Sequence, residues 1–561
     1  MSWLKKYAKQ EPLSLPAAPA IAAETGGAAR ILGRRHTPLH AAMRPIRGSD
    51  FHNGAFLRKF TEHTVTESIT FLGKPKCCSG VMQVASVCTG SANDCLALDA
   101  LSAAMKREGL DLGFEICFNC ELRPEKRTWI NDVHSALHPD KPVPCNFTDI
   151  NELTTNARLC SVHGKRCSLP SALDGIIGGL SCKDYARCNS NKPGGSVYQQ
   201  ASSPGRSADC MHGLLALVDS THPEWLLLEN TDQLAVNASH TPDLDLFMHD
   251  LSSRGYEIKV FVLESSDFVL PQARVRCYIT AVLRPGRMFS IADYQSYFKH
   301  VEELVERVKL CGPGLAEILS PDSDQAVQEA LEARQKQTQK SVLTSRTMNE
   351  HRAAWALMGM RFTTGVDRIA KADGSSPWYQ SLCAAKQARL QYHQHVNAVK
   401  LREAGKSPDM DIELLRRSEA TGAVVDLHPS LSFMSAGVLS ASSQLITPTI
   451  LPDSDYYVSI ARTSCLAYGT PGVHRCIIGE EMLMLNAWCT RLPCLIPIVA
   501  ARSDHFLADL GGNAFSTTVV AAMVCSITFA AEMKQDERAA TSSEDAAVCM
   551  QLLKRARTDA A

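Results

Sequence analysis

A cysteine placed after two glycines is the first feature of this 561-residue sequence that could do covalent chemistry. The stretch 174–179 reads as a buried strand, and Cys182 follows directly after it. Gly178 and Gly179 allow a sharp turn and leave space beside the thiol. Lys183 favours the thiolate, the species that attacks carbon. Cys182 is therefore a candidate nucleophile, although a lone cysteine is more often a small core residue.

Two downstream segments carry groups that could assist such a nucleophile. Glu229 closes a strongly apolar strand, where an acid kept protonated can donate a proton or a hydrogen bond to a ring nitrogen. Gln272, Arg274 and Arg276 stand at the start of another strand, and alternation predicts that both arginines project to one face. Guanidinium groups suit a phosphate or a polarised carbonyl.

A third set of residues has the order expected of a nucleoside-binding edge. A Val-rich strand runs into a turn of small residues around Gly90, and the next two strands end at Glu121 and Asp149. An acid at such a strand end can accept hydrogen bonds from a ribose, although both acids could instead simply cap helices. The predicted cofactor contacts near these strand ends are Cys88, Gly90, Ser91, Ala92, Glu121, Leu122, Asp149, Ile150 and Gly179.

The elements that must position these residues alternate along the chain. Short apolar runs predict strands at 81–87, 114–118, 175–177, 225–228, 258–263 and 277–283, and helical patterns lie at 91–107, 124–137, 207–221 and 243–254. Strands alternating with helices predict a doubly wound α/β sheet. Only 264–276 separates the last two strands, which is too short for a helical crossover. The sheet is therefore predicted to be mixed, with one antiparallel pair.

The order of these motifs resembles the cytosine-C5 DNA methyltransferase family. Ser181-Cys182 resembles the family's catalytic Pro-Cys loop, and Glu229-Asn230-Thr231 resembles its Glu-Asn-Val motif. Its Gln-x-Arg-x-Arg motif is matched by Gln272, Arg274 and Arg276, and its Gly-Arg-Ser by residues 205–207. The stretch 475–486 is similar to the penultimate motif, and 511–515 to the last one. The motifs cover about 81–283 and 440–530.

The resemblance implies a Rossmann-like S-adenosylmethionine-dependent enzyme that methylates C5 of a cytosine flipped out of duplex DNA. The Cys182 thiolate would add to C6 of the ring. Glu229 would donate a proton or a hydrogen bond to N3, and Arg274 would contact the O2 side and help to hold the base. Asn230, Gln272 and Arg276 would bind substrate, and Asn513 and Ala514 would complete the cofactor pocket. The sequence departs from the family at Cys88, Ser91 and Ala92 in the cofactor turn, at Ser181 and Lys183, and at Asn486-Ala487.

The domain organisation follows from changes in composition along the chain. Residues 1–80 are predicted to be a disordered tail, 81–285 the catalytic core, and 286–440 a mainly helical insert or target-recognition region. Apolar, strand-like texture returns at 423–460. Residues 441–534 are predicted to complete the core, ending in an amphipathic helix over 517–534, and 535–561 to be a second tail.

Composition limits the class of protein and its partners. Lys+Arg and Asp+Glu total 58 and 59, so any nucleic acid must bind at a local patch. No apolar run reaches about 18 residues, so no membrane is predicted. Cys117 and Cys120 form a C-x-x-C, and Cys160 and Cys167 bracket His163, but one pair would lie in a strand and the other in a loop. No metal site is predicted, and the 21 cysteines are expected to be reduced.

The expected function is DNA methylation, which implies a location in the nucleus. Two other functions remain open. One keeps the chemistry and moves it to tRNA, although the Cys-Phe-Thr signature of that branch is missing. The other is a catalytically silent relative that binds cofactor or DNA, which the altered loop at Ser181 favours. Retention of Cys182, Glu229 and the full Gln-x-Arg-x-Arg motif opposes it.

Overall fold

The structure is a computed structural model of the chain. It describes residues 30–31, 46–74, 79–155, 158–186, 196–199, 206–237, 240–284, 286, 289–338, 377–382, 386–387, 390, 422–427, 437–440, 447–451, 455–460 and 473–533. Among the predicted features, the Gly of the Gly-Arg-Ser motif, most of the first 45 residues, most of 339–421 in the predicted helical insert and the tail 535–561 lie outside these residues.

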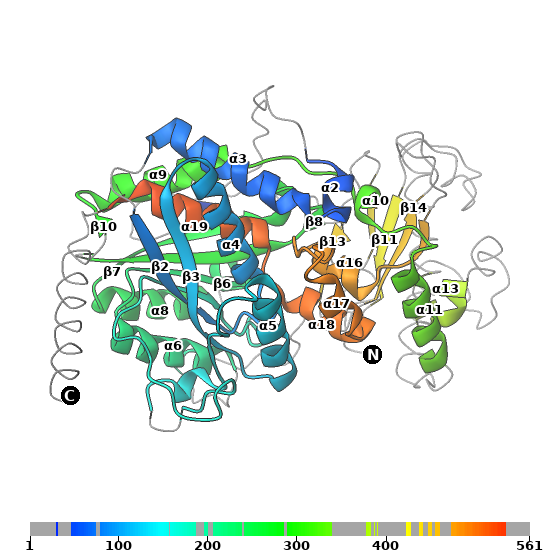
Figure 1. Cartoon of the computed structure of the whole chain (residues 1–561), viewed down its shortest axis with the longest axis horizontal. Helices are drawn as coiled ribbons and strands as arrows, with labels where there is room; N and C mark the ends of the chain where they lie inside the picture. Colours follow the sequence, from blue (N-terminus) through cyan, green and yellow to red (C-terminus); the bar gives the residue numbers. More distant parts are fainter. Residues whose placement is uncertain are drawn as a thin grey trace, which may run out of the picture.

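An eight-stranded mixed sheet forms the centre of the larger part of the protein (Figure 1). Its strand order is β1-β7-β9-β6-β5-β2-β3-β4. Strand β9 is antiparallel to β7 and β6, and the other pairs are parallel. The bounds are β1 Arg30–Ile31, β2 Ser79–Val87, β3 Asp111–Cys120, β4 Cys145–Phe147, β5 Gly175–Gly179, β6 Trp225–Thr231, β7 Tyr256–Glu264 and β9 Val275–Leu283. The predicted mixed α/β sheet and its antiparallel pair are confirmed.

Helices cover both faces of this sheet (Figure 1). One face carries α3 (Ala55–Leu72), α4 (Asn93–Arg107), α9 (Tyr294–Arg307) and α19 (Thr517–Ala530), with α5 (Pro124–Leu137) beside α4. The other carries α6 (Ser207–Thr221) and α8 (Thr241–Ser253). Along β2, Met82 and Val84 face the first layer while Ala85 and Val87 face the second, since alternate strand residues point to opposite faces.

The N-terminal segment corrects the sequence prediction of a tail up to residue 80. Residues 46–74 contain α2 (Gly48–His52) and the 18-residue helix α3, which packs on α4 and α19. Phe56, Phe60 and Val65 are fully buried. The four-residue spacing of Phe56 and Phe60 places these two on one helix face, a pattern that the basic and Pro/Ala-rich sequence around it concealed.

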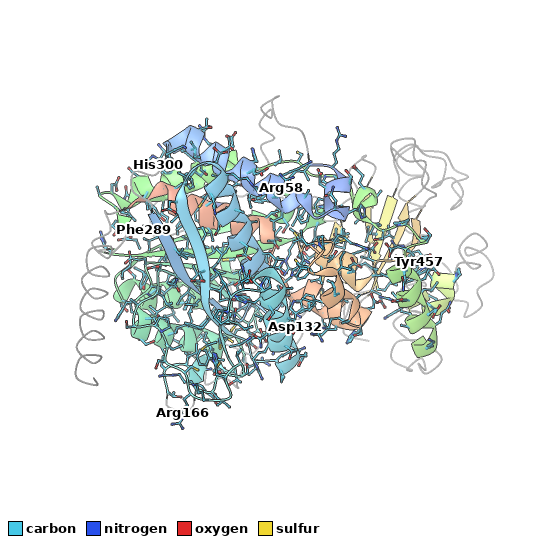
Figure 2. The ribbon with its side chains drawn as sticks, viewed as in Figure 1. Arg58, Asp132, Arg166, Phe289, His300 and Tyr457 are labelled. Atoms are coloured by element: carbon cyan, nitrogen blue, oxygen red, sulfur yellow. The ribbon has the colours of Figure 1, made fainter. Side chains whose placement is uncertain are left out.

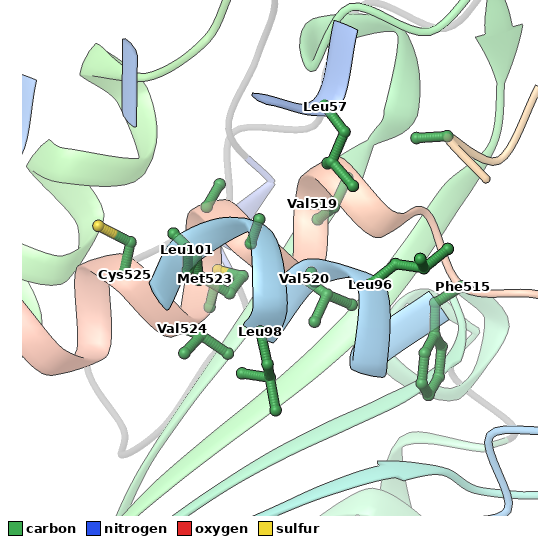
Figure 3. Packing of buried hydrophobic residues seen from close by; sticks show 14 of the residues in the cluster. Leu57, Leu96, Leu98, Leu101, Phe515, Val519, Val520, Met523, Val524 and Cys525 are labelled. Carbon is green, nitrogen blue, oxygen red and sulfur yellow. The ribbon is translucent and has the colours of Figure 1, made fainter. Parts of the chain in front are cut away.

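Helix α19 is a core helix and not the predicted amphipathic one. Its residues from Thr517 to Phe529 are all buried, and Val520 and Met523 pack against Leu98 and Leu101 of α4 (Figure 3). Asp504–Ala530 is apolar enough by length and composition to span a membrane, but 89% of its most apolar window is buried inside the protein. The helix ends at Ala530, before the pair of β10 (Phe289–Ser290) with β16 (Glu532–Met533).

A second, four-stranded antiparallel sheet lies beside the main one, at the right of Figure 1. Its strands are β12 (Gly437–Ser440), β11 (Gly422–Asp426), β14 (Tyr456–Ile460) and β15 (Val473–Cys476). Strands therefore pair across the predicted boundary between residues 440 and 441. The helices in this part are α10 (Leu315–Ile318), α11 (Gln325–Thr338), α13 (Pro377–Ser381), α16 (Gly479–Met484), α17 (Ile496–Ala500) and α18 (Asp504–Asn513).

Several short elements lie around the edge of the main sheet at which the strands β2, β3, β5 and β6 end. They are the 3-10 helices η1 (Ile150–Glu152) and η2 (Ser265–Asp267), the helix α7 (Gln233–Val236), and the paired strands β8 (Gln272–Ala273) and β13 (Thr447–Pro448). Parallel strands bring their carboxyl ends to one edge, so the predicted site residues that follow these strands are gathered there.

Candidate active site

The turn between β2 and α4 holds three residues in the left-handed region. The φ angle is +57° at Cys88, +64° at Gly90 and +61° at Ala92. This conformation costs an alanine about 1 kcal/mol, and Ala92 replaces a glycine of the resembled motif. Two indole N–H groups compensate, because Trp129 Nε1 and Trp488 Nε1 donate to the Ser91 carbonyl at 3.1 and 2.9 Å. The altered turn therefore keeps a tightly fixed shape.

Glu121 lies directly against this turn. A Cβ built on Gly90 would stand 3.6 Å from Glu121 Oε2, in van der Waals contact, so the carboxylate lies directly beside residue 90. Oε1 accepts a hydrogen bond from the Arg123 amide at 3.0 Å. Burial raises the pKa of Glu121 although that amide opposes the shift. Leu122 beside it is 47% exposed. A carboxylate at a glycine turn next to an exposed apolar side chain fits a ribose and a base.

The second predicted acid has a structural role in the described geometry. Asp149 caps η1, and its Oδ1 accepts from the Asn151 amide at 2.9 Å and from Asn151 Nδ2 at 3.2 Å. Ile150 is buried in the core under β4. The capping alternative is therefore shown for Asp149, and its contact with a cofactor stays a prediction.

The C-terminal segment closes over the β2–α4 turn. Asn93 Nδ2 donates to the carbonyls of Asn486 and Phe515 and to Thr517 Oγ1 at 2.8 to 3.1 Å. Asn513 Nδ2 bonds within α18, to the Asp509 carbonyl at 2.8 Å. Ala514, the next residue, is buried. The motif at 511–515 thus lies beside the turn at the end of β2. Asn93 is the main polar link between the two.

Gly179 joins the cofactor turn to the loop that carries the cysteine. A Cβ on Gly179 would stand 2.7 Å from the Cys88 carbonyl and 2.9 Å from the Phe515 ring, so only glycine fits here. Because Val87 pairs with Gly178, strands β2 and β5 end at the same level. The residues after Gly179 therefore emerge beside the turn around Gly90.

Cys182 is exposed in the loop that follows β5. The buried side chain of Asp184 connects this loop to the start of helix α6. Asp184 Oδ2 accepts from Arg206 Nε at 3.2 Å and from the Ser207 amide at 3.0 Å, and the Asp184 amide donates to Ser207 Oγ at 3.2 Å. Burial opposes ionisation of Asp184, but Arg206 and the Ser207 amide outweigh it and lower its pKa. Asp184 was missed as a site residue, although its neighbour Cys182 and the Arg-Ser of the Gly-Arg-Ser motif were both recognised.

We expect Asp184→Asn to lower kcat by about 10- to 100-fold, because the cysteine loop would lose its charged anchor and the thiol its position. Cofactor affinity should stay within about twofold, since Asp184 is a positioning residue away from the turn. Single-turnover kinetics and calorimetric binding separate the two effects. Asp219→Asn is the matched control, because its pair with Arg254 is on the surface. Equal kcat in the two variants would refute this role.

Glu229 and Arg276 form a half-buried ion pair next to the cysteine loop. Glu229 pairs with Gly179 across β5 and β6 and with Tyr278 across β6 and β9. Arg276 is two residues before Tyr278, so it shares that face and its Nε lies 3.0 Å from Glu229 Oε1. Both side chains are 13% exposed. Oε1 of Glu229 accepts no aligned hydrogen bond within the protein, so this carboxylate can still form a hydrogen bond with a substrate.

Arg274 corrects the sequence prediction that it touches the substrate. Its side chain is buried, and Nη1 and Nη2 donate to the carbonyls of Ile450 and Ala514 at 3.1 and 2.7 Å. Burial, with the neighbouring Arg276 charge, lowers the pKa of Arg274 to about 10. Arg274 therefore braces the C-terminal segment, and Arg276 is the guanidinium available beside Glu229. Arg274 precedes β9, which begins at Val275, whereas Arg276 lies within it.

The other two predicted substrate residues are also engaged with the protein. Gln272 Nε2 donates to the Leu485 carbonyl at 3.0 Å and supports the turn after α16. Asn230 Oδ1 accepts from the Thr231 amide at 2.8 Å, and Asn230 Nδ2 reaches the Leu180 carbonyl at 3.4 Å. Both side chains are fully buried. In this geometry they position the site and do not face a ligand.

The three groups at the centre of the sequence hypothesis lie at one edge of the sheet. The charges of Glu229 and Cys182 oppose the lowering of the Arg274 pKa by burial and by Arg276, so both groups lie near Arg274. The cysteine loop follows β5, Glu229 lies near the end of β6, Arg274 directly precedes β9, and the glycine turn follows β2. An exposed thiol beside an acid–guanidinium pair can perform covalent catalysis on a planar polar ring.

Asp94, in the first turn of α4, gives a prediction about stability. Burial raises its pKa from 3.8 to about 6, despite hydrogen bonds from Ser86 and Thr89. The folded protein therefore binds this proton more tightly, and stability is lost as pH rises from about 4 through 6. Asp94→Asn should stabilise the protein by about 2–3 kcal/mol at pH 8 and by much less at pH 4.5. Urea unfolding at both pH values measures this; an equal gain at both would contradict it.

Comparison with known proteins identifies relatives of this sequence. Residues 102–412 match the family C-5 cytosine-specific DNA methylase, which is more than half of the chain. The chain is 24% identical over 457 residues to a DNA (cytosine-5-)-methyltransferase DMT5 of Cryptococcus neoformans, covering 80% of this chain and 17% of that protein. A DMT5 of Verticillium dahliae is 22% identical, covering 79% and 19%. The chain thus spans less than a fifth of the length of these relatives.

Bacterial proteins and solved structures show similarity over different extents. The Staphylococcus aureus Type II methyltransferase M.Sau3AI is 25% identical over 155 residues, covering 27% of this chain and 36% of that protein. Among solved structures, the S. pombe Dnmt2 methyltransferase is 11% identical with a TM-score of 0.34, covering 80% of this chain and 98% of that one.

Proposed function

Since this chain belongs to the C-5 cytosine-specific DNA methylase family, we propose that it transfers a methyl group from S-adenosylmethionine to C5 of cytosine in DNA. The observation that carries the proposal is the exposed thiol of Cys182 at the sheet edge where Glu229 and Arg276 pair. Because the curated relatives are far longer, the substrate and activity of the whole protein are part of the proposal.

The chemistry follows from the weakness of C5 as a nucleophile. The Cys182 thiolate adds to C6, which forms the S–C6 bond and moves electrons through the ring to C5. Glu229 donates a proton or a hydrogen bond to N3, so that negative charge does not accumulate on this ring nitrogen. Arg276 lies where it can hold the O2 side, the role that the sequence had assigned to Arg274. C5 would then take the methyl group from the sulfonium of S-adenosylmethionine, whose S–CH3 bond breaks. A base removes the C5 proton, and elimination of the Cys182 thiolate restores the ring.

The methyl donor fits the residues at the glycine turn. S-adenosylmethionine supplies an electrophilic methyl group when bound. Glu121 has Oε2 facing Gly90 for a ribose, and the exposed Leu122 offers an apolar surface for a base. Gly179 brings the cysteine loop directly beside this turn, so donor and nucleophile would meet at one edge. The protein's contribution is position and electrostatics.

The target base must leave the double helix, because neither C6 nor C5 can be reached inside a stacked duplex. We assign duplex contacts to the region 286–440 and the four-stranded sheet that continues from it. A DNA substrate implies a nuclear protein, which fluorescence of a tagged chain would test. Residues 441–533 supply Phe515 and Asn486 to the cofactor turn and therefore complete the core.

A methyl-transfer assay tests the proposed function. The full chain is incubated with tritiated S-adenosylmethionine and with unmethylated duplex DNA, hemimethylated duplex DNA or tRNA. The proposal expects label in DNA, found after hydrolysis as 5-methylcytosine. Label in tRNA alone would replace DNA by RNA as the substrate. Cofactor binding without transfer to any of them would favour a catalytically silent accessory protein.

A further inference from the structure

Three sulfurs and one imidazole meet outside the active site, at the free edge of the main sheet. Cys145, Cys160, His163 and Cys167 place their ligand atoms within 4.8 Å of one another. His163 Nδ1 lies 3.5, 3.3 and 3.4 Å from the sulfurs of Cys145, Cys160 and Cys167. We infer that these four side chains bind one structural zinc ion.

The distances between the ligand atoms match those of a tetrahedral zinc site. Zinc binds sulfur at about 2.3 Å and imidazole nitrogen at about 2.0–2.1 Å, so a tetrahedral angle separates S and N by about 3.6 Å. The three S–N distances in the protein are within a few tenths of an ångström of this value. An ordinary thiol–imidazole hydrogen bond explains one such contact, but it does not bring three sulfurs around a single nitrogen.

The backbone is folded to present these ligands. Cys145 begins β4, and Cys160 forms isolated bridges with Phe147 and Lys165. The turn 160–165 closes through the Gly164 amide, which donates to the Cys160 carbonyl at 2.9 Å, and Gly164 is left-handed at φ +64°. Amides of Asn146, Val162 and His163 hydrogen-bond the Cys160 sulfur. Amides around a sulfur stabilise a thiolate, the form that binds zinc.

No metal was predicted from the sequence because Cys160, His163 and Cys167 were considered together with Cys117 and Cys120, and not with Cys145. Cys117 and Cys120 lie in β3, and Cys117 stands at the β-bulge, where the pairing shifts from Ile116 to Phe118. Cys145, the fourth ligand, is 15 residues before Cys160 and forms no short motif with it. A second group, Cys95, Asp99 and His138, is explained by the 3.0 Å ion pair between its aspartate and histidine.

A metal at this place would fasten a long connection to the cofactor edge. The described residues of 153–174, between η1 and β5, form turns, isolated bridges and irregular backbone, without a helix or a named strand. The tip of this connection, near Arg166, projects at the lower margin of the protein (Figure 2). The ion would tie it to β4, two residues before Asp149. Four side-chain bonds would add to the few buried side chains of this segment, such as Leu153 and Leu173, in fixing it to the sheet.

The test measures the metal directly, on full chain purified without a polyhistidine tag from zinc-containing medium. Mass spectrometry should find about one zinc per folded chain. Cys160→Ser and Cys167→Ser should lose most of it, whereas the control Cys311→Ser, an exposed cysteine elsewhere, should retain it. Cobalt(II) in place of zinc should give a near-ultraviolet thiolate charge-transfer band and intense visible bands of tetrahedral geometry. Chelation should lower the melting temperature of the wild type but not its Cys167→Ser variant.

Two results would overturn the inference. One is folded wild-type chain with no zinc above the Cys167→Ser level and no cobalt spectrum after reduction. The other is a disulfide between two of these cysteines that persists in freshly prepared protein. Should a variant fail to fold, the wild-type zinc content and cobalt spectrum still decide. Methyl transfer is not used as a readout, so the zinc site stands or falls separately from the proposed function.

Discussion

Replacing Cys182 by serine should reduce methyl transfer by at least about 10⁴-fold, because a hydroxyl is a far weaker nucleophile than a thiolate. Cys182 is exposed, so the change creates no cavity, and the melting temperature should move little. Binding of S-adenosylmethionine should be preserved, because the glycine turn is held by Trp129, Trp488 and Asn93. Rate measurements with tritiated donor and calorimetric donor binding check the two halves of this prediction.

Cys494→Ser is the matched control, since Cys494 is also exposed but lies between α16 and α17, away from the cysteine loop. Its methyl-transfer rate should equal that of the wild type. A Cys182→Ser variant that keeps more than about a tenth of the rate would show that another group is the nucleophile. Loss of donor binding as well would show that the substitution disturbs the turn, and the rate would then say nothing about nucleophilicity.

Glu229→Gln should lower the rate by about 10²- to 10⁴-fold, the range for loss of a positioned acid–base group. Glutamine keeps the size of the side chain but cannot give a proton to N3. It also leaves the Arg276 guanidinium without its carboxylate at a site where both are 13% exposed, so some stability should be lost. Single-turnover rates on DNA, together with urea unfolding, measure the two effects.

The exposed pair of Glu257 and Arg284 in the same sheet is the control for this prediction. Glu257→Gln should change neither rate nor stability appreciably, because surface ion pairs contribute about 0–1 kcal/mol. The double variant Glu229→Gln with Arg276→Gln should be little slower than Glu229→Gln alone if the two act as a unit. Purely additive losses would argue that Arg276 acts independently of Glu229.

The sheet and its flanking helices were predictable because their signals are local. Helices α5 and α6 begin and end where the periodicity placed them, at 124–137 and 207–221. Strands buried on both faces read as continuous apolar runs, and the short link 264–276 required an antiparallel pair. Helix α3 escaped because its buried positions interrupt a basic stretch. Helix α19 was predicted as a helix from residue 517, but as an amphipathic one, whereas it is buried on every side.

The site was only partly predictable because strand register is not local. The spacing of Arg274 and Arg276 showed two guanidiniums but not which one would meet Glu229. That depends on Tyr278 pairing with Glu229, which puts Arg276 on the same face, and on the C-terminal carbonyls that engage Arg274. The role of Asp184 depends in the same way on α6 starting beside the cysteine loop. The thiol cluster required knowing that Cys145 pairs at a sheet edge.

A covalent trap on DNA tests the central claim, that Cys182 attacks C6 of a cytosine while S-adenosylmethionine supplies the methyl group. Duplex DNA containing 5-fluorocytosine is incubated with the chain and the methyl donor, and the product is resolved under denaturing conditions. Because fluorine at C5 cannot leave as a proton does, we expect a stable protein–DNA adduct whose peptide map places the nucleotide on Cys182. Methylated DNA without any such adduct, or an adduct that persists in Cys182→Ser, would contradict the mechanism.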